Sequence, residues 1–185
     1  MLGKIARHNH IMHRPLFAAV LLALGLQPGA VSAAGWETAD GTAFTHVDET
    51  NSTIVALSVQ CDGEMNLEVF SANDGPILNS TLGATGDFHY QPGKVQGEID
   101  GEMFPLAAAG SEWSTVILSE GGADDNYLSP LTAPFVAALR GGTSLVLRFD
   151  LLPDRAPDGS PFETAARFSL QGAAAAMDST GSGCH

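Results

Sequence analysis

Carboxylates are the side chains of this sequence whose spacing comes nearest to catalytic chemistry. Glu98, Asp100 and Glu102 flank a predicted hairpin turn, and Glu98 and Asp100 fall on one face of the first strand. Paired carboxylates act as acid and base, or as acid and nucleophile, in glycoside hydrolysis. A solvated hairpin face would carry the same residues without any chemistry, and the sequence indicates no cleft around them. The structural interpretation is favoured, and a small extracytoplasmic hydrolase that uses paired carboxylates is kept as the alternative function.

A second acidic group, Asp124-Asp125-Asn126, offers oxygen atoms of the kind that bind calcium. Its spacing matches neither an EF-hand loop nor a glycine-rich calcium-binding repeat, so a solvated loop is the favoured interpretation. We expect no metal site and no cofactor.

Nucleophilic and general-base chemistry has little support in the sequence. Neither a Gly-x-Ser-x-Gly turn nor a His-Glu-x-x-His helix occurs. The histidines beyond the predicted leader, His46, His89 and His185, lie far apart along the chain. The sequence therefore predicts no catalytic residue and favours a non-enzymatic protein.

Cys61 and Cys184 are the only two cysteines. In an exported protein two cysteines are expected to be oxidised, and with only two the connectivity is fixed. The alternative is a pair of buried free thiols. That alternative is less favoured, because Cys184 lies in a Gly-Ser-Gly-Cys-His tail that would leave a reactive thiol exposed. We therefore predict a Cys61–Cys184 disulfide bond.

Residues 1–33 have the pattern of a Sec signal peptide. A basic start precedes the apolar run Leu16–Leu26, and small residues suited to cleavage follow at Val31-Ser32-Ala33. A membrane anchor is the alternative, but the apolar run is shorter than the ~20 residues that a spanning helix needs. We expect residues 34–185 to form a single secreted β domain, periplasmic or extracellular, with no membrane span after cleavage.

The chain beyond residue 33 is strongly acidic. It keeps five of the eight Lys and Arg residues and all 21 Asp and Glu residues, which gives it a net charge of −16. Such a surface repels nucleic acid and anionic lipid headgroups. The charge suits solubility in an extracytoplasmic space, and it also suits a basic partner. We expect a protein partner, of basic character if charge guides the encounter, and no nucleic acid.

Alternating apolar residues predict the hairpin around which the domain is organised. A strand over 53–61 places Val55, Leu57, Val59 and Cys61 on one face, and an Asp-Gly turn leads into a second alternating run. The first strand is therefore expected to be half-buried, with these residues towards the core.

The remaining elements complete a mainly β pattern. Asp100-Gly101 predicts another hairpin of the same kind. One helix is indicated by Thr132 as its N-cap and Gly141-Gly142 at its end, and the alanine-rich segment 173–177 predicts a second, shorter one. Hairpins dominate and no strand–helix–strand alternation occurs. We expect an antiparallel β-sandwich or flattened barrel with one or two short helices.

Two predicted strands bear on how a partner could bind. Pro105 marks its own strand as an edge, because proline cannot donate to a central ladder. The strand over 113–118 is apolar on both faces and contains no proline that would block the addition of another strand, so an extended partner could pair with it. Trp113, with Asp124 and Asp125 of the adjoining acidic loop, is therefore a candidate partner contact. The alternative is that this strand lies in the centre of the sheet.

The last third of the chain resembles two families of exported bacterial proteins. The segment Ala138-Leu-Arg-Gly-Gly-Thr-Ser-Leu-Val-Leu-Arg-Phe149, followed by Ala166-Arg-Phe-Ser-Leu-Gln-Gly-Ala-Ala-Ala-Ala-Met177, resembles the end of the invasion-associated locus B family. The same ending, with Val59-Gln60-Cys61 before a hairpin and Cys184 near the C-terminus, is similar to the type VI secretion-associated VasI/TagO family. Both resemblances imply an exported, mainly β domain and transfer no active-site residue. We therefore expect an exported bacterial envelope protein that serves as a non-enzymatic binding or accessory module.

Overall fold

The computed structural model describes residues 35–72, 93–111, 114–150 and 155–181. These residues belong to one compact unit of the chain, Ser32–His185. The predicted signal peptide lies outside the described residues, as do His89, Trp113, Cys184 and His185. The predictions made for these positions therefore stay predictions.

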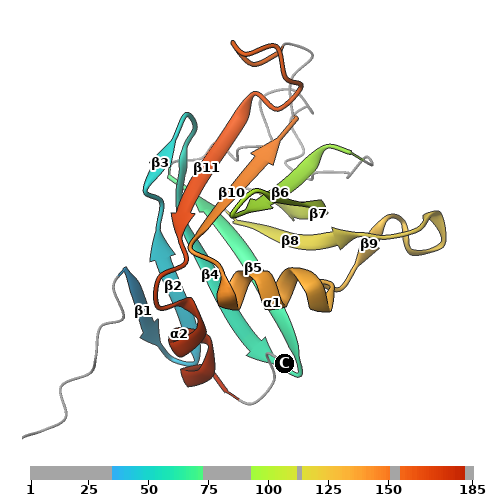
Figure 1. Ribbon diagram of the computed structural model, residues 1–185. Helices are drawn as coiled ribbons and strands as arrows, with labels where there is room; N and C mark the ends of the chain where they lie inside the picture. Colours follow the sequence, from blue (N-terminus) through green and yellow to red (C-terminus); the bar gives the residue numbers. More distant parts are fainter. Residues whose placement is uncertain (1–34, 73–92, 112–113, 151–154, 182–185) are drawn as a thin grey trace, which may run out of the picture. The chain divides into compact units, whose positions relative to one another are not determined.

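The strands form a single sheet in which every described pairing is antiparallel (Figure 1). Their order in the sheet is β1-β2-β4-β5-β8-β7-β6-β10-β11-β3, and β9 pairs with β8. The strands are β1 (Trp36–Ala39), β2 (Thr42–His46), β3 (Glu49–Thr50), β4 (Ile54–Asp62), β5 (Glu64–Ser71), β6 (Val95–Ile99), β7 (Glu102–Ser111), β8 (Ser114–Glu120), β9 (Leu128–Ser129), β10 (Ser144–Phe149) and β11 (Thr164–Ser169). The predicted mainly antiparallel β fold is confirmed.

The sheet bends back so that the two ends of its strand order meet at β11. β3 follows closely after β2 in the chain, yet it pairs with β11 at the opposite end of the order. The backbone N–H of Asp48 donates to the carbonyl of Arg167 at 2.9 Å, and the indole N–H of Trp36 donates to the carbonyl of Ser169 at 2.9 Å. These bonds satisfy backbone groups that a free sheet edge would leave exposed.

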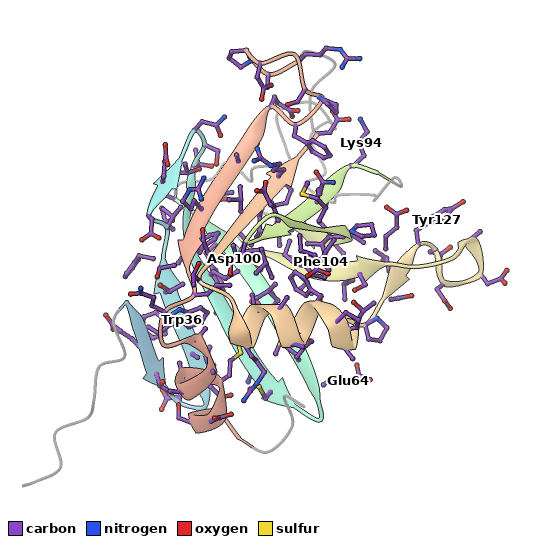
Figure 2. The ribbon with its side chains drawn as sticks, viewed as in Figure 1. Trp36, Glu64, Lys94, Asp100, Phe104 and Tyr127 are labelled. Atoms are coloured by element: carbon purple, nitrogen blue, oxygen red, sulfur yellow. The ribbon has the colours of Figure 1, made fainter. Side chains whose placement is uncertain are left out.

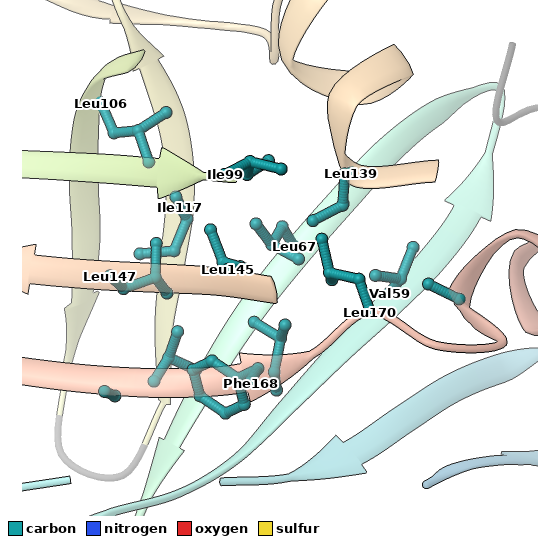
Figure 3. Packing of buried hydrophobic residues seen from close by; sticks show 14 of the residues in the cluster. Val59, Leu67, Ile99, Leu106, Ile117, Leu139, Leu145, Leu147, Phe168 and Leu170 are labelled. Carbon is teal, nitrogen blue, oxygen red and sulfur yellow. The ribbon is translucent and has the colours of Figure 1, made fainter. Parts of the chain in front are cut away.

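One face of the sheet is buried as the core. Leu57 and Val59 of β4 and Leu145 and Leu147 of β10 are fully buried and alternate with residues that face the other side. Figure 3 shows Leu145 and Leu147 gathered with side chains from β5, β6, β8 and β11. Full burial of such a side chain contributes about 1.5–3 kcal/mol, so this alternation holds the strand register.

α1 (Ala133–Gly141) packs on this core through its apolar side. The ring of Phe135 meets that of Phe104 from β7 edge to face, with centroids 5.3 Å apart and an interplanar angle of 72°; Figure 2 shows Phe104 beside the helix. Thr132 precedes the helix as predicted. Its carbonyl accepts the N–H of Val136 at 3.0 Å, and its side chain makes no capping hydrogen bond.

α2 (Ala173–Ser179) also confirms a predicted helix. It packs against β1 and β2 and buries Ala173, Ala176 and Met177. Of the described helices, neither is long and apolar enough to cross a membrane.

The face predicted for β4 is wrong at its start. Val55 is 37% exposed, whereas Ile54 is 1% exposed and joins the core. The register between β4 and β5 shifts between Ile54 and Ala56, as in a β-bulge, and this shift reverses the alternation before Leu57. The backbone carbonyl of Val55 stays paired, accepting the N–H of Val47 at 3.0 Å.

Both edge-strand predictions are wrong. β7, which contains Pro105, lies between β6 and β8. It pairs with β6 over Glu102–Leu106 and with β8 over Leu106–Ser111, so at Pro105 only the β6 side is paired. The missing N–H therefore removes no bond to β8. β8 itself pairs with both β5 and β7, which confirms the alternative of a central strand and excludes the addition of an extended partner along it.

Candidate binding sites on the outer face of the sheet

Outward-facing side chains of the described residues line two hollows on the sheet. The arginine hollow, of about 270 Å³, lies over β3, β10 and β11, and the amide hollow, of about 360 Å³, lies over β2, β4 and β5. The arginine hollow is lined by Glu49, Thr50, Asn51, Val146, Arg148, Ala165 and Arg167. The amide hollow is lined by Thr42, Phe44, Ala56, Ser58, Gln60, Asn66, Glu68 and Phe70.

Strand alternation places two arginines in the arginine hollow. Arg148 lies opposite Ala165, and Val146 lies opposite Arg167, in the antiparallel pair of β10 and β11. The flanking residues Leu147 and Ala166 are buried in the core, so both arginines point outward. They occupy diagonal positions of the ladder, where side chains start about 7–8 Å apart, and Val146 and Ala165 lie between them.

The two guanidinium groups are held to different degrees. Nη2 of Arg148 donates to Oε2 of Glu98 on β6 at 3.0 Å. Nε of Arg167 lies 3.7 Å from Oε2 of Glu49, which is beyond hydrogen-bond distance, and the Glu49 side chain is 81% exposed. Nη1 of Arg167 donates to Oγ of Ser144 at 3.3 Å. Among the described residues, a hydrogen-bonded ion pair therefore orients Arg148, while the ionic partner of Arg167 is looser.

The wall of the arginine hollow is built by side chains that bond to β11. Asn51 accepts the N–H of Ala165 through Oδ1 and donates to the carbonyl of Glu163 through Nδ2, both at 2.8 Å. Oγ1 of Thr50 donates to the carbonyl of Ala165 at 2.9 Å. These bonds fix the short strand β3 against β11, because the backbone ladder between them is only two residues long.

The amide hollow combines aromatic rings with polar side chains. Ser58 of β4 lies opposite Phe44 of β2 on one side and Glu68 of β5 on the other, and Gln60 lies opposite Asn66. Within the described chain, the side chains of Gln60, Asn66 and Glu68 make no hydrogen bond or ion pair. Their donors and acceptors are therefore available to a ligand, which could pack at the same time against the half-buried ring of Phe44.

The carboxylates with catalytic spacing do not converge. Glu98 pairs with Arg148, while Asp100 lies in the β6–β7 turn and accepts hydrogen bonds from Thr143 and Ser144. The Thr143 hydroxyl, then its N–H and that of Ser144, hold the pKa of Asp100 below its ordinary value. Among the described residues, each hollow is lined by one carboxylate, Glu49 in the first and Glu68 in the second. This geometry gives the hydrolase alternative no pair of carboxylates in a cleft.

The acidic segment 124–126 forms a compact turn between β8 and β9. A short 3-10 helix, η1 (Ala123–Asp125), is followed by Asn126 and Tyr127 in left-handed conformations. Asp124, Asp125 and Asn126 are all exposed. The N–H of Tyr127 donates to the carbonyl of Gly122 at 2.9 Å, so Tyr127 lies at the base of this turn, where Figure 2 labels it. In the described part of the chain no three His, Cys, Asp or Glu residues are grouped as a metal site would require.

Cys61 lies against the end of the described chain. The hydroxyl of Thr180 donates to Sγ of Cys61 at 3.2 Å, and a Cβ on Gly181 would lie 3.6 Å from the Cys61 carbonyl oxygen. Cys184 follows Gly181 by three residues but lies outside the described residues, so the disulfide bond stays a prediction.

Sequence reasoning missed both hollows. A signal for the first was present, since few cations remain beyond the leader and Arg148 and Arg167 stand in alternating strands. The sequence could not place those strands side by side with β3, because 115 residues separate Thr50 from Ala165.

Comparison with protein-family models, with curated proteins and with solved structures finds no match to this chain. The resemblance to the two exported families is therefore neither supported nor contradicted by these comparisons.

Proposed function

We propose that the protein is an exported, non-enzymatic binding or accessory module of a bacterial envelope, and that it holds a protein partner at the amide hollow. The observation that carries this proposal is the set of polar groups of Gln60, Asn66 and Glu68, which have no partner in the described chain and lie beside Phe44 and Phe70. The volume of the amide hollow, about 360 Å³, is in the range of ligand sites.

The composition of this surface suits recognition more than catalysis. Aromatic side chains supply apolar contact area, and amides supply hydrogen bonds of defined direction. Glu68 adds one negative charge, which agrees with the expected basic character of the partner. The described lining holds Glu68 as its single carboxylate and contains no His, Lys or Cys, so it offers no acid–base pair.

Export is the second part of the proposal. It rests on the leader pattern of residues 1–33, on the acidic chain that follows, and on the resemblance to exported envelope families. Expression of the full chain in a Gram-negative host, followed by fractionation and intact mass, tests it. A periplasmic or secreted species shortened by about 33 residues is expected, and a full-length cytoplasmic species would refute export.

Partner binding is tested with a variant that fills the amide hollow. Gln60 and Asn66 are exposed cross-strand neighbours, so the double substitution Gln60→Arg/Asn66→Arg adds bulk there without entering the core. The control Ala137→Arg/Gln171→Arg adds the same charge at exposed sites outside both hollows. The three tagged proteins are compared as baits in cross-linked envelope extract.

The proposal expects a partner that wild type and control capture and that Gln60→Arg/Asn66→Arg loses. Equal capture by all three proteins would exclude the amide hollow as the contact. Absence of any specific partner for the wild type would count against the binding role itself.

A further inference from the structure

We propose that the arginine hollow is a carboxylate-binding site, in which Arg167 and Arg148 hold the carboxylate of a small ligand or of a peptide C-terminus. This inference rests on the proposed binding role, but it concerns a different surface from the amide hollow. The two proposals can therefore fail separately.

The N–H donors of Arg148 and Arg167 suit a carboxylate ligand. A guanidinium group has five N–H donors in a planar fork that matches a carboxylate. Among the described residues, Arg148 donates to Glu98 and Arg167 donates to Ser144. Most donors of both groups thus remain for a ligand, and the Glu98 contact holds Arg148 in place before a ligand arrives.

Lys94 and Arg140, unlike Arg167, have close carboxylate partners. Lys94 lies 2.7 Å from the carboxylate of Asp150, and Arg140 is in close contact with that of Asp178. Arg167, in contrast, has Glu49 at 3.7 Å, and that carboxylate is largely in solvent. A ligand carboxylate could displace Glu49 at little cost, because an exposed ion pair of this length contributes about 0–1 kcal/mol.

The negative charge of the protein favours a ligand that carries a single negative charge. The net charge of the full chain is −13, and Glu49 and Glu98 lie next to the two arginines. A polyanion such as nucleic acid or a phosphorylated surface would be repelled by this field. A single carboxylate on an otherwise neutral molecule gains the local attraction and pays a smaller long-range penalty, because it carries only one negative charge.

The floor of the hollow indicates what the carboxylate is attached to. Val146 and Ala165 lie between the two arginines in the strand ladder and offer a small apolar surface. A volume of about 270 Å³ admits one small group. A short aliphatic carboxylate fits this description, either free or as the last residue of a peptide.

The test is an NMR titration of the ¹⁵N-labelled protein at low salt. The probes are N-acetyl-Ala-Ala with a free C-terminus, the same peptide as its C-terminal amide, and butyrate. With the two carboxylates we expect saturable chemical-shift changes of the backbone N–H groups of Val146, Ala165 and Arg167, with a Kd in the millimolar range. We expect no such change with the C-terminally amidated peptide. A tighter response to the peptide acid than to butyrate would identify a peptide end as the ligand, and equal responses would identify a free carboxylate.

Three substitutions separate recognition from structure. Arg167→Gln should weaken binding by about tenfold or more, whereas Arg155→Gln, an exposed arginine outside the hollow that bonds to the Gly159 carbonyl, should leave it unchanged. Glu49→Gln removes the competing carboxylate and should strengthen binding. A purely structural Arg167–Glu49 pair would not produce this gain.

The proposal is overturned if no saturable shift occurs, if the acid and the amide behave alike, or if Arg155→Gln weakens binding as much as Arg167→Gln. If Arg167→Gln does not fold, the response of Glu49→Gln decides. Unchanged or weaker binding of the acid by Glu49→Gln would then overturn the proposal.

Discussion

Thr143 donates two hydrogen bonds to the carboxylate of Asp100, one from Oγ1 at 2.6 Å and one from the backbone N–H at 2.8 Å. The N–H of Ser144 adds a third at 3.1 Å. Asp100 occupies the β6–β7 turn with a φ of 49°, so these bonds tie that turn to the segment that leads from α1 into β10. Figure 2 shows Asp100 at this junction.

Asp100→Asn should therefore destabilise the protein by more than the loss of a surface charge. Asn keeps the turn conformation and one acceptor, but it cannot accept all three bonds with a charged group. We expect the Tm to fall by several degrees in thermal denaturation. The matched control is Asp40→Asn. Asp40 has the same φ of 49° in another Asp-Gly turn and no side-chain hydrogen bond within the described residues. Equal Tm losses in both variants would contradict a specific role for the Asp100 carboxylate.

The same contacts predict how stability depends on pH. The hydroxyl and N–H of Thr143 lower the pKa of Asp100, and the N–H and hydroxyl of Ser160 lower that of Asp158, from an ordinary value of 3.8. Near that pH the folded state therefore binds fewer protons than the unfolded state. The stabilisation is present above the unfolded-state pKa and is lost as the pH falls through the lowered folded-state pKa.

Thermal denaturation of wild type and Asp100→Asn from pH ~6 to pH ~2 measures this dependence. The difference in Tm between the two proteins should be full at the upper end and should shrink below pH ~4. A difference that stays constant over the whole range would show that the Asp100 carboxylate is not stabilised by folding.

Because of the β-bulge in β4, we expect substitutions of the neighbours Ile54 and Val55 to differ in their effect on the free energy of unfolding. Ile54→Ala should cost about 2–5 kcal/mol of unfolding free energy, because it opens a cavity in the core. Val55→Ala removes a partly exposed side chain and should cost about 1 kcal/mol or less. Denaturant unfolding of both variants checks the order. The reverse order would restore the simple alternation in which Val55 faces the core.

Local patterns in the sequence predicted most of the elements and few of their neighbours. The hairpin at Asp100-Gly101 and the helix that follows Thr132 depend on nearby residues, and both were predicted correctly. The sequence pattern does not predict the bulge at Ile54, because one inserted residue reverses the alternation without any change in composition.

The strand order could not be read from the sequence for a different reason. Pro105 predicts an edge strand, but β7 changes partner next to it, and the proline needs only one unpaired side. The arginine hollow depends likewise on β3 and β11, which are distant in the chain. Side chains on separate strands converge through backbone pairing, and that pairing leaves little trace in either strand alone.

The predicted disulfide bond gives a further test at the end of the chain. The hydrogen bond from Thr180 brings the C-terminal segment onto Cys61, and the three residues from Gly181 to Cys184 can span roughly 10 Å. Cys61→Ser and Cys184→Ser should each lower stability by about 2–5 kcal/mol while the far-UV circular dichroism stays similar. Reductant should reproduce this loss in the wild type and add nothing to either variant. A wild-type Tm that does not respond to reductant would show that the bond is absent or unimportant.

The acidic turn between β8 and β9 carries the last prediction. The central position of β8 removes edge pairing as the way in which a partner binds there, but Asp124 and Asp125 remain exposed beside Tyr127. If charge guides a basic partner to this turn, Asp124→Lys/Asp125→Lys should slow association and weaken its dependence on salt. Stability should change little, since neither side chain is buried. Association rates for the partner captured by the wild type, measured at two salt concentrations, test this.

Glu37→Lys/Glu102→Lys serves as the control, because it makes the same charge change at exposed positions elsewhere. An equal effect in the two variants would show that only the net charge matters. Unchanged rates in Asp124→Lys/Asp125→Lys would show that the turn is a solvated connection.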